Sequence, residues 1–220
     1  PESVSGALAA QRFETYGLAL DQKFPTQTYL GISAELLRSE DTQTVGTYDF
    51  LFPDLTSTPS GTRQHLKFEE KSLSITLNQL ISNEISVGTR YQLRHADLNE
   101  SFPDLPASAF SSPAISQSQH PSGTLHQLHL YAIYNHPSGF FSQFQSVWSV
   151  QSNSGYSPDQ PGDDFWQFNA FVGYRFPRRY VELSVGVLNI TDRDYRLNPL
   201  TLYAELPRER TAVVTLKINF

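Results

Sequence analysis

Hydrophobic and polar residues alternate with a period of two along most of this chain. Between Ala212 and Phe220 every second residue is apolar, and the residues between them are mostly polar. Successive side chains of a β-strand point to opposite faces, so this pattern predicts a strand with one apolar face. Similar patterns predict nine strands, near residues 11–24, 28–38, 64–80, 85–94, 124–135, 140–151, 166–176, 181–187 and 210–220. We therefore expect an all-β protein.

The segments between these strands alternate between short and long. Short connections are expected at 25–26, 81–84, 136–139 and 177–179, and long ones at 39–63, 98–122, 152–163 and 191–208. The long segments are rich in Gly, Pro, Ser and Asp, which is typical of loops. Short turns at one end and long loops at the other are typical of antiparallel up-and-down barrels in bacterial outer membranes.

Composition narrows the possible classes of protein. The 220 residues contain no cysteine, which excludes disulfide scaffolds and thiolate metal sites. A formal net charge of -6 argues against a nucleic-acid partner. No apolar run approaches the roughly 18 residues of a transmembrane helix. Because the chain starts at Pro1 and contains no methionine, we expect a processed product or part of a longer protein.

Alternating strands also occur in soluble β-sandwiches, so the two alternatives must be separated. Most of the predicted strands run about 10 to 14 residues, longer than the usual 5 or 6, and a tilted bilayer crossing takes about 9 to 11. Aromatic residues also gather near the strand ends, as at membrane interfaces. These features favour a single domain over residues 1–220, an antiparallel up-and-down transmembrane β-barrel of about 9–10 strands in the bacterial outer membrane of a Gram-negative cell.

In such a barrel the alternation assigns roles to individual side chains. The charged residues on the polar face are expected to point into the lumen; they are Arg90, Arg94, Arg175, Glu182 and Lys217. They could line a permeation path, as in a porin, or pair with one another in a filled lumen. The aromatic residues expected at the membrane interfaces are Trp148, Trp166, Phe140, Phe176 and Tyr180.

The last forty residues carry a family resemblance. The run Asn189-Ile190-Thr191-Asp192, followed by Tyr195, resembles the element that closes the penultimate strand of TonB-dependent receptors. Residues 206–211 are similar to that family's approach to the last strand, although Glu209 replaces the family's glycine. The final strand resembles the C-terminal signal read by the outer-membrane barrel assembly machinery; its key residues are Leu216, Ile218 and Phe220.

The resemblance implies passage of a solute or polymer across the outer membrane. It covers the C-terminal part of such a barrel, and neither a plug domain nor an energy-coupling segment is found in the chain. Bacterial single-chain barrels have even strand numbers, so nine strands indicate part of a larger barrel. Expected partners are the lipid bilayer, the assembly machinery, and an energy-coupling or periplasmic partner reached through N-terminal parts. Two alternatives remain: an exporter barrel behind periplasmic helical repeats, and a small stand-alone barrel with an adhesive or structural role.

Catalytic and metal-binding motifs are weak. His126 and His129 differ by an odd number and should face opposite sides of a strand. His65 and His95 lie on neighbouring predicted strands and could approach each other as a metal pair. A hydrolase site at the barrel rim would draw either on His95 with Asp97, or on Asp163 and Asp164. Because no nucleophile motif accompanies them, we expect a protein that is not an enzyme and that has no catalytic, cofactor-binding or metal-binding residues.

Overall fold

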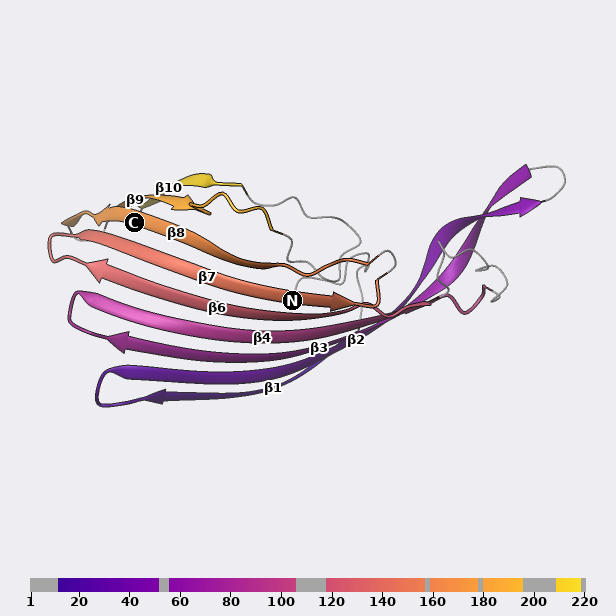
Figure 1. The fold of residues 1–220 in the computed structure, drawn as a ribbon, viewed down its shortest axis with the longest axis horizontal. Coiled ribbons are helices and arrows are strands. Elements are labelled where there is room, and N and C mark those ends of the chain that lie inside the picture. The colour runs from indigo at the N-terminus through magenta and orange to yellow at the C-terminus, as the bar shows by residue number, and fades with distance from the viewer. Residues whose placement is uncertain are drawn as a thin grey trace.

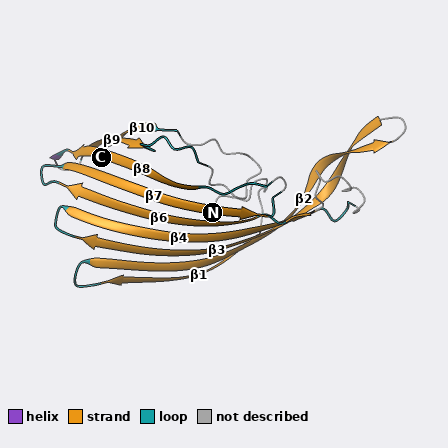
Figure 2. Ribbon diagram, viewed as in Figure 1, coloured by secondary structure: helices purple, strands orange, loops and turns teal. Residues whose placement is uncertain are grey.

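One antiparallel sheet makes up nearly all of the computed structural model (Figures 1 and 2). The structure describes residues 12–51, 56–105, 118–156, 159–177, 180–195 and 209–218. The strands are β1 (Arg12–Lys23), β2 (Thr28–Leu51), β3 (Thr56–Leu80), β4 (Ile85–Ser101), β5 (Ser118–Gln119), β6 (Ser122–Asn135), β7 (Phe140–Ser154), β8 (Asp164–Arg175), β9 (Val181–Leu188) and β10 (Thr211–Ile218).

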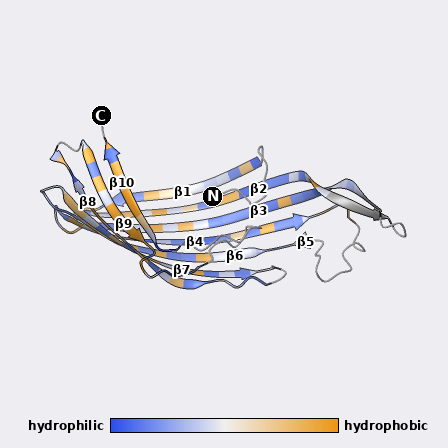
Figure 3. Ribbon diagram, turned by 90° about the horizontal axis from the view of Figure 1, so that it is seen from above, coloured by the Kyte–Doolittle hydropathy of each residue, from blue (hydrophilic) through white to orange (hydrophobic). Residues whose placement is uncertain are grey.

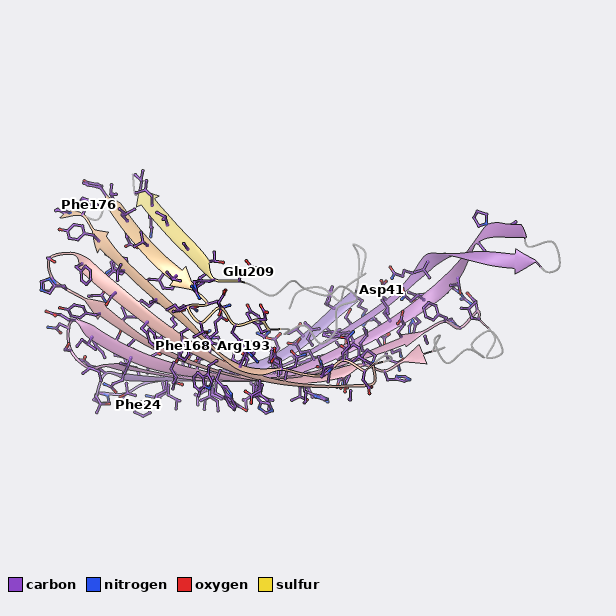
Figure 4. The ribbon with its side chains drawn as sticks, turned by 45° about the horizontal axis from the view of Figure 1, so that its top comes forward. Phe24, Asp41, Phe168, Phe176, Arg193 and Glu209 are labelled. Atoms are coloured by element: carbon purple, nitrogen blue, oxygen red, sulfur yellow. The ribbon has the colours of Figure 1, made fainter. Side chains whose placement is uncertain are left out.

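Chain order and sheet order coincide. The nine long strands follow the order β1-β2-β3-β4-β6-β7-β8-β9-β10, and the two-residue β5 pairs with the end of β4. Each strand is antiparallel to its neighbours, so the prediction of an all-β, antiparallel, up-and-down sheet is confirmed. Within the described residues β1 and β10 do not pair, and the sheet is an open, curved trough rather than a closed barrel (Figures 1 and 4).

The long connection predicted over 39–63 is wrong for most of its length. Strands β2 and β3 continue as a paired hairpin out to Leu51 and Thr56, well beyond the ends of their neighbours (Figure 1). The segment contains threonine, valine and tyrosine, which favour strands, and pairing satisfies its backbone groups without a hydrophobic face. Most side chains described on this extension, such as Thr42, Gln43 and Thr44, are polar, which explains why periodicity did not reveal it.

Three of the predicted short turns lie at the opposite end of the sheet, and the fourth, 177–179, falls partly outside the described residues. Residues 24–27, 81–84 and 136–139 each join two neighbouring strands. The hydroxyl of Ser82 accepts hydrogen bonds from the backbone N–H groups of Glu84 (3.2 Å) and Ile85 (3.1 Å). Gly139 has a φ of 102°, a conformation that is strained for other residues and that closes the β6–β7 turn.

Candidate functional site: the two faces of the sheet

The strand register places the apolar positions of all nine long strands on one face. This apolar belt includes the following side chains: Tyr16, Leu18 and Leu20; Leu30, Ile32, Ala34 and Leu36; Leu73, Ile75 and Leu77; Ile85, Val87, Tyr91 and Leu93; Leu128, Leu130, Ala132 and Tyr134; Phe140, Phe144, Trp148 and Val150; Trp166, Phe168, Ala170, Val172 and Tyr174; Val181, Leu183, Val185 and Val187; Ala212, Val214, Leu216 and Ile218. Figure 3 shows the alternation of hydrophobic and hydrophilic positions along the strands.

The more apolar face of this sheet is the exposed one, and the buried strand side chains among the described residues, five of them hydrophobic, lie almost entirely on the other face. Large apolar side chains of the belt are exposed, with Leu18 at 83% and Val214 at 72%. Strand side chains that are buried lie instead on the opposite, mostly polar face, where Ser149 is 0% and Asn169 is 8% exposed. Among the described strand residues Ser146 is the exception, because it is buried on the apolar face. Side chains crowd together on the inner side of a curved sheet, so the polar face is the concave one.

The apolar belt runs obliquely across the strands. The row of paired residues through Leu18 on β1 reaches β7 at Val150. The row through Leu216 on β10 reaches β7 at Phe140. Val150 and Phe140 lie about ten residues, or ~33 Å, apart along β7. Across the sheet, the eight strand-to-strand steps from β1 to β10 span ~38 Å. The belt therefore crosses the strands at the angle expected for a strand tilt of about 40°.

Aromatic side chains mark both edges of the belt in its β6–β9 part. At the loop end Trp148 and Trp166 stack with ring centroids 6.3 Å apart, and the indole N–H of Trp148 donates to Asp164 (2.9 Å). Exposed aromatic residues mark the turn end, namely Phe140, Phe176 and Tyr180. All five residues predicted as interface aromatics therefore lie at an edge of this face or beside a turn.

Charged residues mark the edge of the belt on β1–β4, beyond its loop end. Signs alternate across β1–β3, so that Arg38 lies between Glu14 and Glu69 in one row. On β4, however, the residue paired with Glu69 is Asp97. Arg38 Nε lies 2.8 Å from Glu69 Oε2, and Lys71 Nζ lies 2.8 Å from Glu69 Oε1. Exposed ion pairs contribute little stability, about 0 to 1 kcal/mol each. Their position matters more, because a row of charged side chains marks where the apolar belt ends on these strands.

The polar face carries all five charges predicted to lie on it. Arg175, Glu182 and Lys217 occupy one row across β8, β9 and β10. Arg175 Nε donates to Glu182 (2.8 Å), and its Nη1 donates to the side chain of Asn135 (2.6 Å). Its guanidinium also lies 4.1 Å from the ring centroid of Phe141. Arg175 is therefore held by three neighbours.

Arg90 and Arg94 differ from Arg175 although they share its face. Both are exposed on β4, and no described carboxylate lies within ion-pair distance of either. The two predicted alternatives for these charges thus occur side by side: one arginine is paired in a filled part of the face, and two are open to solvent.

Aromatic rings cover glycines on the polar face, a feature that the sequence analysis missed. A Cβ atom on Gly173 would lie 2.4 Å from the ring of Phe141, and one on Gly186 would lie 2.2 Å from the ring of Phe171. On Gly88 it would lie 2.4 Å from Tyr131. In each case the ring comes from a neighbouring strand, so the pair becomes visible only when the register is known.

The loop after β9 folds back over the polar face. The amide of Asn189 donates to Asn169 Oδ1 (2.9 Å), and the ring of Tyr195 stacks on Phe165 at 4.6 Å. Asn189 and Asp192 adopt positive φ angles of 50° and 54°, and the Asn189 side chain bonds the backbone of Arg193. These asparagine and aspartate side chains therefore shape a turn.

Two side chains in the loops, Asp104 and Tyr156, have shifted pKa values. The hydrogen bond from the Arg63 side chain lowers the pKa of the Asp104 carboxyl, and Arg63 Nε lies 2.8 Å from Asp104 Oδ2. Burial raises the pKa of the Tyr156 phenol to about 12. The Arg63–Asp104 contact ties residues 102–105 to the extended part of β3.

The histidine hypotheses have mixed outcomes. The approach of His65 to His95 is wrong, because His65 pairs with Ser101 and His95 with Lys71 in the β3–β4 ladder. His65 instead contacts Thr42 (2.8 Å). His126 and His129 lie on opposite faces, as predicted. In the part of the chain that the structure describes, no group of three or more His, Asp and Glu side chains could hold a metal ion.

Of the two candidate rim hydrolase pairs, the structure brings His95 and Asp97 into contact. His95 Nε2 lies 3.2 Å from Asp97 Oδ2, and its Nδ1 lies 2.8 Å from Thr124 Oγ1, on the open apolar-belt side. Asp163 directly precedes β8 and lies near Arg193, whereas Asp164 is the first residue of β8 and contacts Trp148. The proposed assembly residues Leu216 and Ile218 lie in the belt, whereas Phe220 lies outside the described residues.

The comparisons with known proteins add no relative: no protein-family model, no curated protein and no solved structure matches the chain. No helix in the described ranges is long and apolar enough to cross a membrane.

Proposed function

We propose that this sheet is the wall of a transmembrane β-barrel in a bacterial outer membrane, through which a solute or polymer passes. The observation that carries the proposal is that the apolar face is exposed, whereas buried side chains lie on the mostly polar face. Apolar side chains such as Leu18 and Val214 are exposed, whereas polar ones such as Ser149 are buried. A lipid-facing exterior and a polar interior produce this arrangement.

The continuous apolar face argues against a soluble sheet of the same shape. Monomeric soluble proteins rarely expose a contiguous apolar patch larger than about 600 Å². Here the exposed belt extends across every long strand from β1 to β10. In water this face would need a covering layer, whereas in a bilayer the hydrocarbon chains cover it.

The oblique course of the belt supports the same proposal. Barrel strands tilt by about 35–45° from the barrel axis, and the lipid-facing band stays level with the membrane. If the strands are tilted and the apolar band stays level, the apolar positions must shift along each successive strand. The drift from Leu18 to Leu216 corresponds to a tilt of about 40°, within that range.

Of the strands that the structure describes, the two at the edges of the sheet, β1 and β10, each have an unpaired side. Strand edges carry unpaired N–H and C=O groups, which the hydrocarbon core does not tolerate. We therefore propose that, in the assembled barrel, further strands pair with β1 and β10, or the two edges pair with each other. The resemblance of residues 181–220 to TonB-dependent receptors supports a barrel of that kind, with a polymer exporter as the alternative.

The extended β2–β3 hairpin favours a second candidate function, an adhesive or recognition role. It projects far beyond its neighbours, and most of its described side chains are polar, so it suits water rather than lipid (Figure 1). Long outer segments of this kind can bind external partners without altering the wall. This role is compatible with passage through the barrel.

The two tryptophans provide a direct test of the membrane proposal. Trp148 and Trp166 are the only tryptophans in the chain, and both lie in the apolar belt. The protein is reconstituted into vesicles of ordinary or brominated phosphatidylcholine, since bromine quenches indole fluorescence only in close contact. We expect strong quenching by brominated lipid. Equal emission intensity in both vesicle types, at the wavelength of water-exposed indole, would refute a lipid-facing belt.

A further inference from the structure

We propose that Arg90 and Arg94 bind the anionic group of a sugar-like solute on the polar face of the sheet. This inference rests on the proposed function, because the polar face lines the lumen only in a barrel. The two residues lie four positions apart on β4, so their side chains are on the same face and their Cα atoms are about 13 Å apart. Gln92 lies between them on the same face.

The two guanidinium groups are available to a ligand. Both side chains are exposed, and the described residues place no carboxylate within ion-pair distance of them. In contrast, Arg175 is occupied by Glu182, Asn135 and Phe141. Arginine binds phosphate and carboxylate through paired N–H donors, so an unoccupied arginine in a polar lumen is suited to an anion.

Neutral hydrogen-bonding groups flank the two arginines along one row. Ser33, Ser74, Gln92, Gln127 and Ser149 occupy successive strands in that row. The row presents hydroxyl and amide groups, which both donate and accept hydrogen bonds. The Gln127 amide donates to Ser149 Oγ (3.2 Å), so part of this row is held in place. A surface of this composition suits a hydroxyl-rich ligand better than an apolar one.

Carboxylates on the same face limit the charge of the ligand. Glu35 shares a row with Arg94, but Ser72 lies between them, and Glu70 lies one row further toward the loop end. These carboxylates would repel a polyanion, yet they accept hydrogen bonds from hydroxyl groups. The arrangement therefore fits a sugar that carries one anionic group, with its hydroxyls directed toward β2 and β3.

A cavity beside Arg90 has a suitable size. Its volume is about 540 Å³, and its lining includes Asp21, Lys23, Ser74, Asn78 and Arg90. Small-molecule sites commonly measure about 300–1,000 Å³. The cavity holds both signs of charge and several neutral polar groups, consistent with a monosaccharide phosphate.

Calorimetric titration of glucose 6-phosphate into the full chain in detergent micelles tests this site. We expect binding by the unaltered protein, and about a tenfold rise in Kd for Arg90→Gln and for Arg94→Gln. Arg38→Gln serves as the matched control, because this arginine lies on the opposite face, and its Kd should not change. Glucose and inorganic phosphate, titrated separately, should each bind at least tenfold more weakly than glucose 6-phosphate.

Several results would overturn the inference. They are absence of glucose 6-phosphate binding, unchanged Kd values in the Arg90 and Arg94 variants, a rise as large in Arg38→Gln, and equal binding of glucose or of phosphate alone. The lipid-quenching experiment separates this outcome from the larger proposal. Retained quenching with no ligand binding refutes only the solute site, whereas loss of quenching refutes the membrane wall.

Discussion

The polar face differs between its two halves, although one pattern of alternation produces both. Over β7–β9 it is filled: rings of Phe141 and Phe171 cover glycines, and Tyr195 stacks on Phe165. Over β1–β4 it is more open: Leu37 and Leu66 are buried toward the loop end, but Arg90 and Arg94 are exposed. Alternation decides which side of a strand faces inward. Contacts between strands then decide whether that inner surface is packed or available to a ligand.

Charged substitutions in the apolar belt should have the largest effect. They test whether the β1–β4 and β7–β9 parts of the sheet differ only on the polar face. Arginine in place of Ile75, in the open half, or of Val185, in the filled half, should cost about 2–4 kcal/mol in lipid vesicles. Both side chains belong to the exposed apolar belt. Urea unfolding in vesicles measures the loss, and Ser184→Arg, on the polar face, is the control. Unequal or negligible costs at Ile75 and Val185 would show that the halves also differ outside.

A second test compares glycines on the two halves. Gly173→Ala would place a Cβ 2.6 Å from the carbonyl oxygen of Leu183 as well as against Phe141, so we expect a loss of about 1–3 kcal/mol. Gly31→Ala, in the open half, meets the flexible carboxylate of Asp21 at 3.0 Å. Its cost should stay below about 0.5 kcal/mol. Equal unfolding midpoints for the two variants would contradict the distinction.

The arginines allow a smaller, more specific comparison. Arg175→Gln leaves the part-buried Glu182 without its partner and should cost about 1 kcal/mol, allowing for partial exposure of the pair. Arg94→Gln removes no ion pair among the described residues, so its effect on unfolding should be under about 0.5 kcal/mol. Chemical unfolding of both variants in the same vesicles gives the comparison. A larger loss for Arg94→Gln would reverse it.

The smallest expected effect concerns pH and the loop tied to the extended hairpin. Arg63 lowers the pKa of Asp104, so the contact stabilises the loop above the ordinary aspartate pKa. This stabilisation should be lost as the pH falls through the lowered, folded-state pKa. Hydrogen exchange at residues 102–105 should therefore accelerate in acid. Asp104→Asn should exchange fast at every pH, once intrinsic rates are subtracted; a pH-dependent difference in that variant would contradict this origin.

The sequence predicted the nine strands, the two faces and the short turns because each depends on local alternation. It did not predict the β2–β3 extension, because Thr42, Gln43 and Thr44 provide no apolar face to detect. The error over His65 and His95 has a different cause. Their separation depends on the register of β3 with β4, which the position of the connecting turn sets and single-residue patterns do not show.

The candidate site was partly predictable for the same reason. Alternation placed Arg90, Arg94 and Arg175 on one face, and the register agrees. It could not distinguish the occupied arginine from the open ones, because Asn135 and Glu182 contact Arg175 from two other strands. The glycine–ring pairs were missed because they also require knowledge of the partner strand.

The oblique belt limits how this chain can change by insertion and deletion. Removing one residue from within a strand such as β7 exchanges its faces, which turns Trp148 and Phe144 inward and Ser149 outward. Removing two residues restores the faces but displaces the strand's apolar stretch by one row against its neighbours. Length variation between related genes should therefore concentrate in the loops and in the β2–β3 hairpin, whereas the wall should keep its residue count strand by strand.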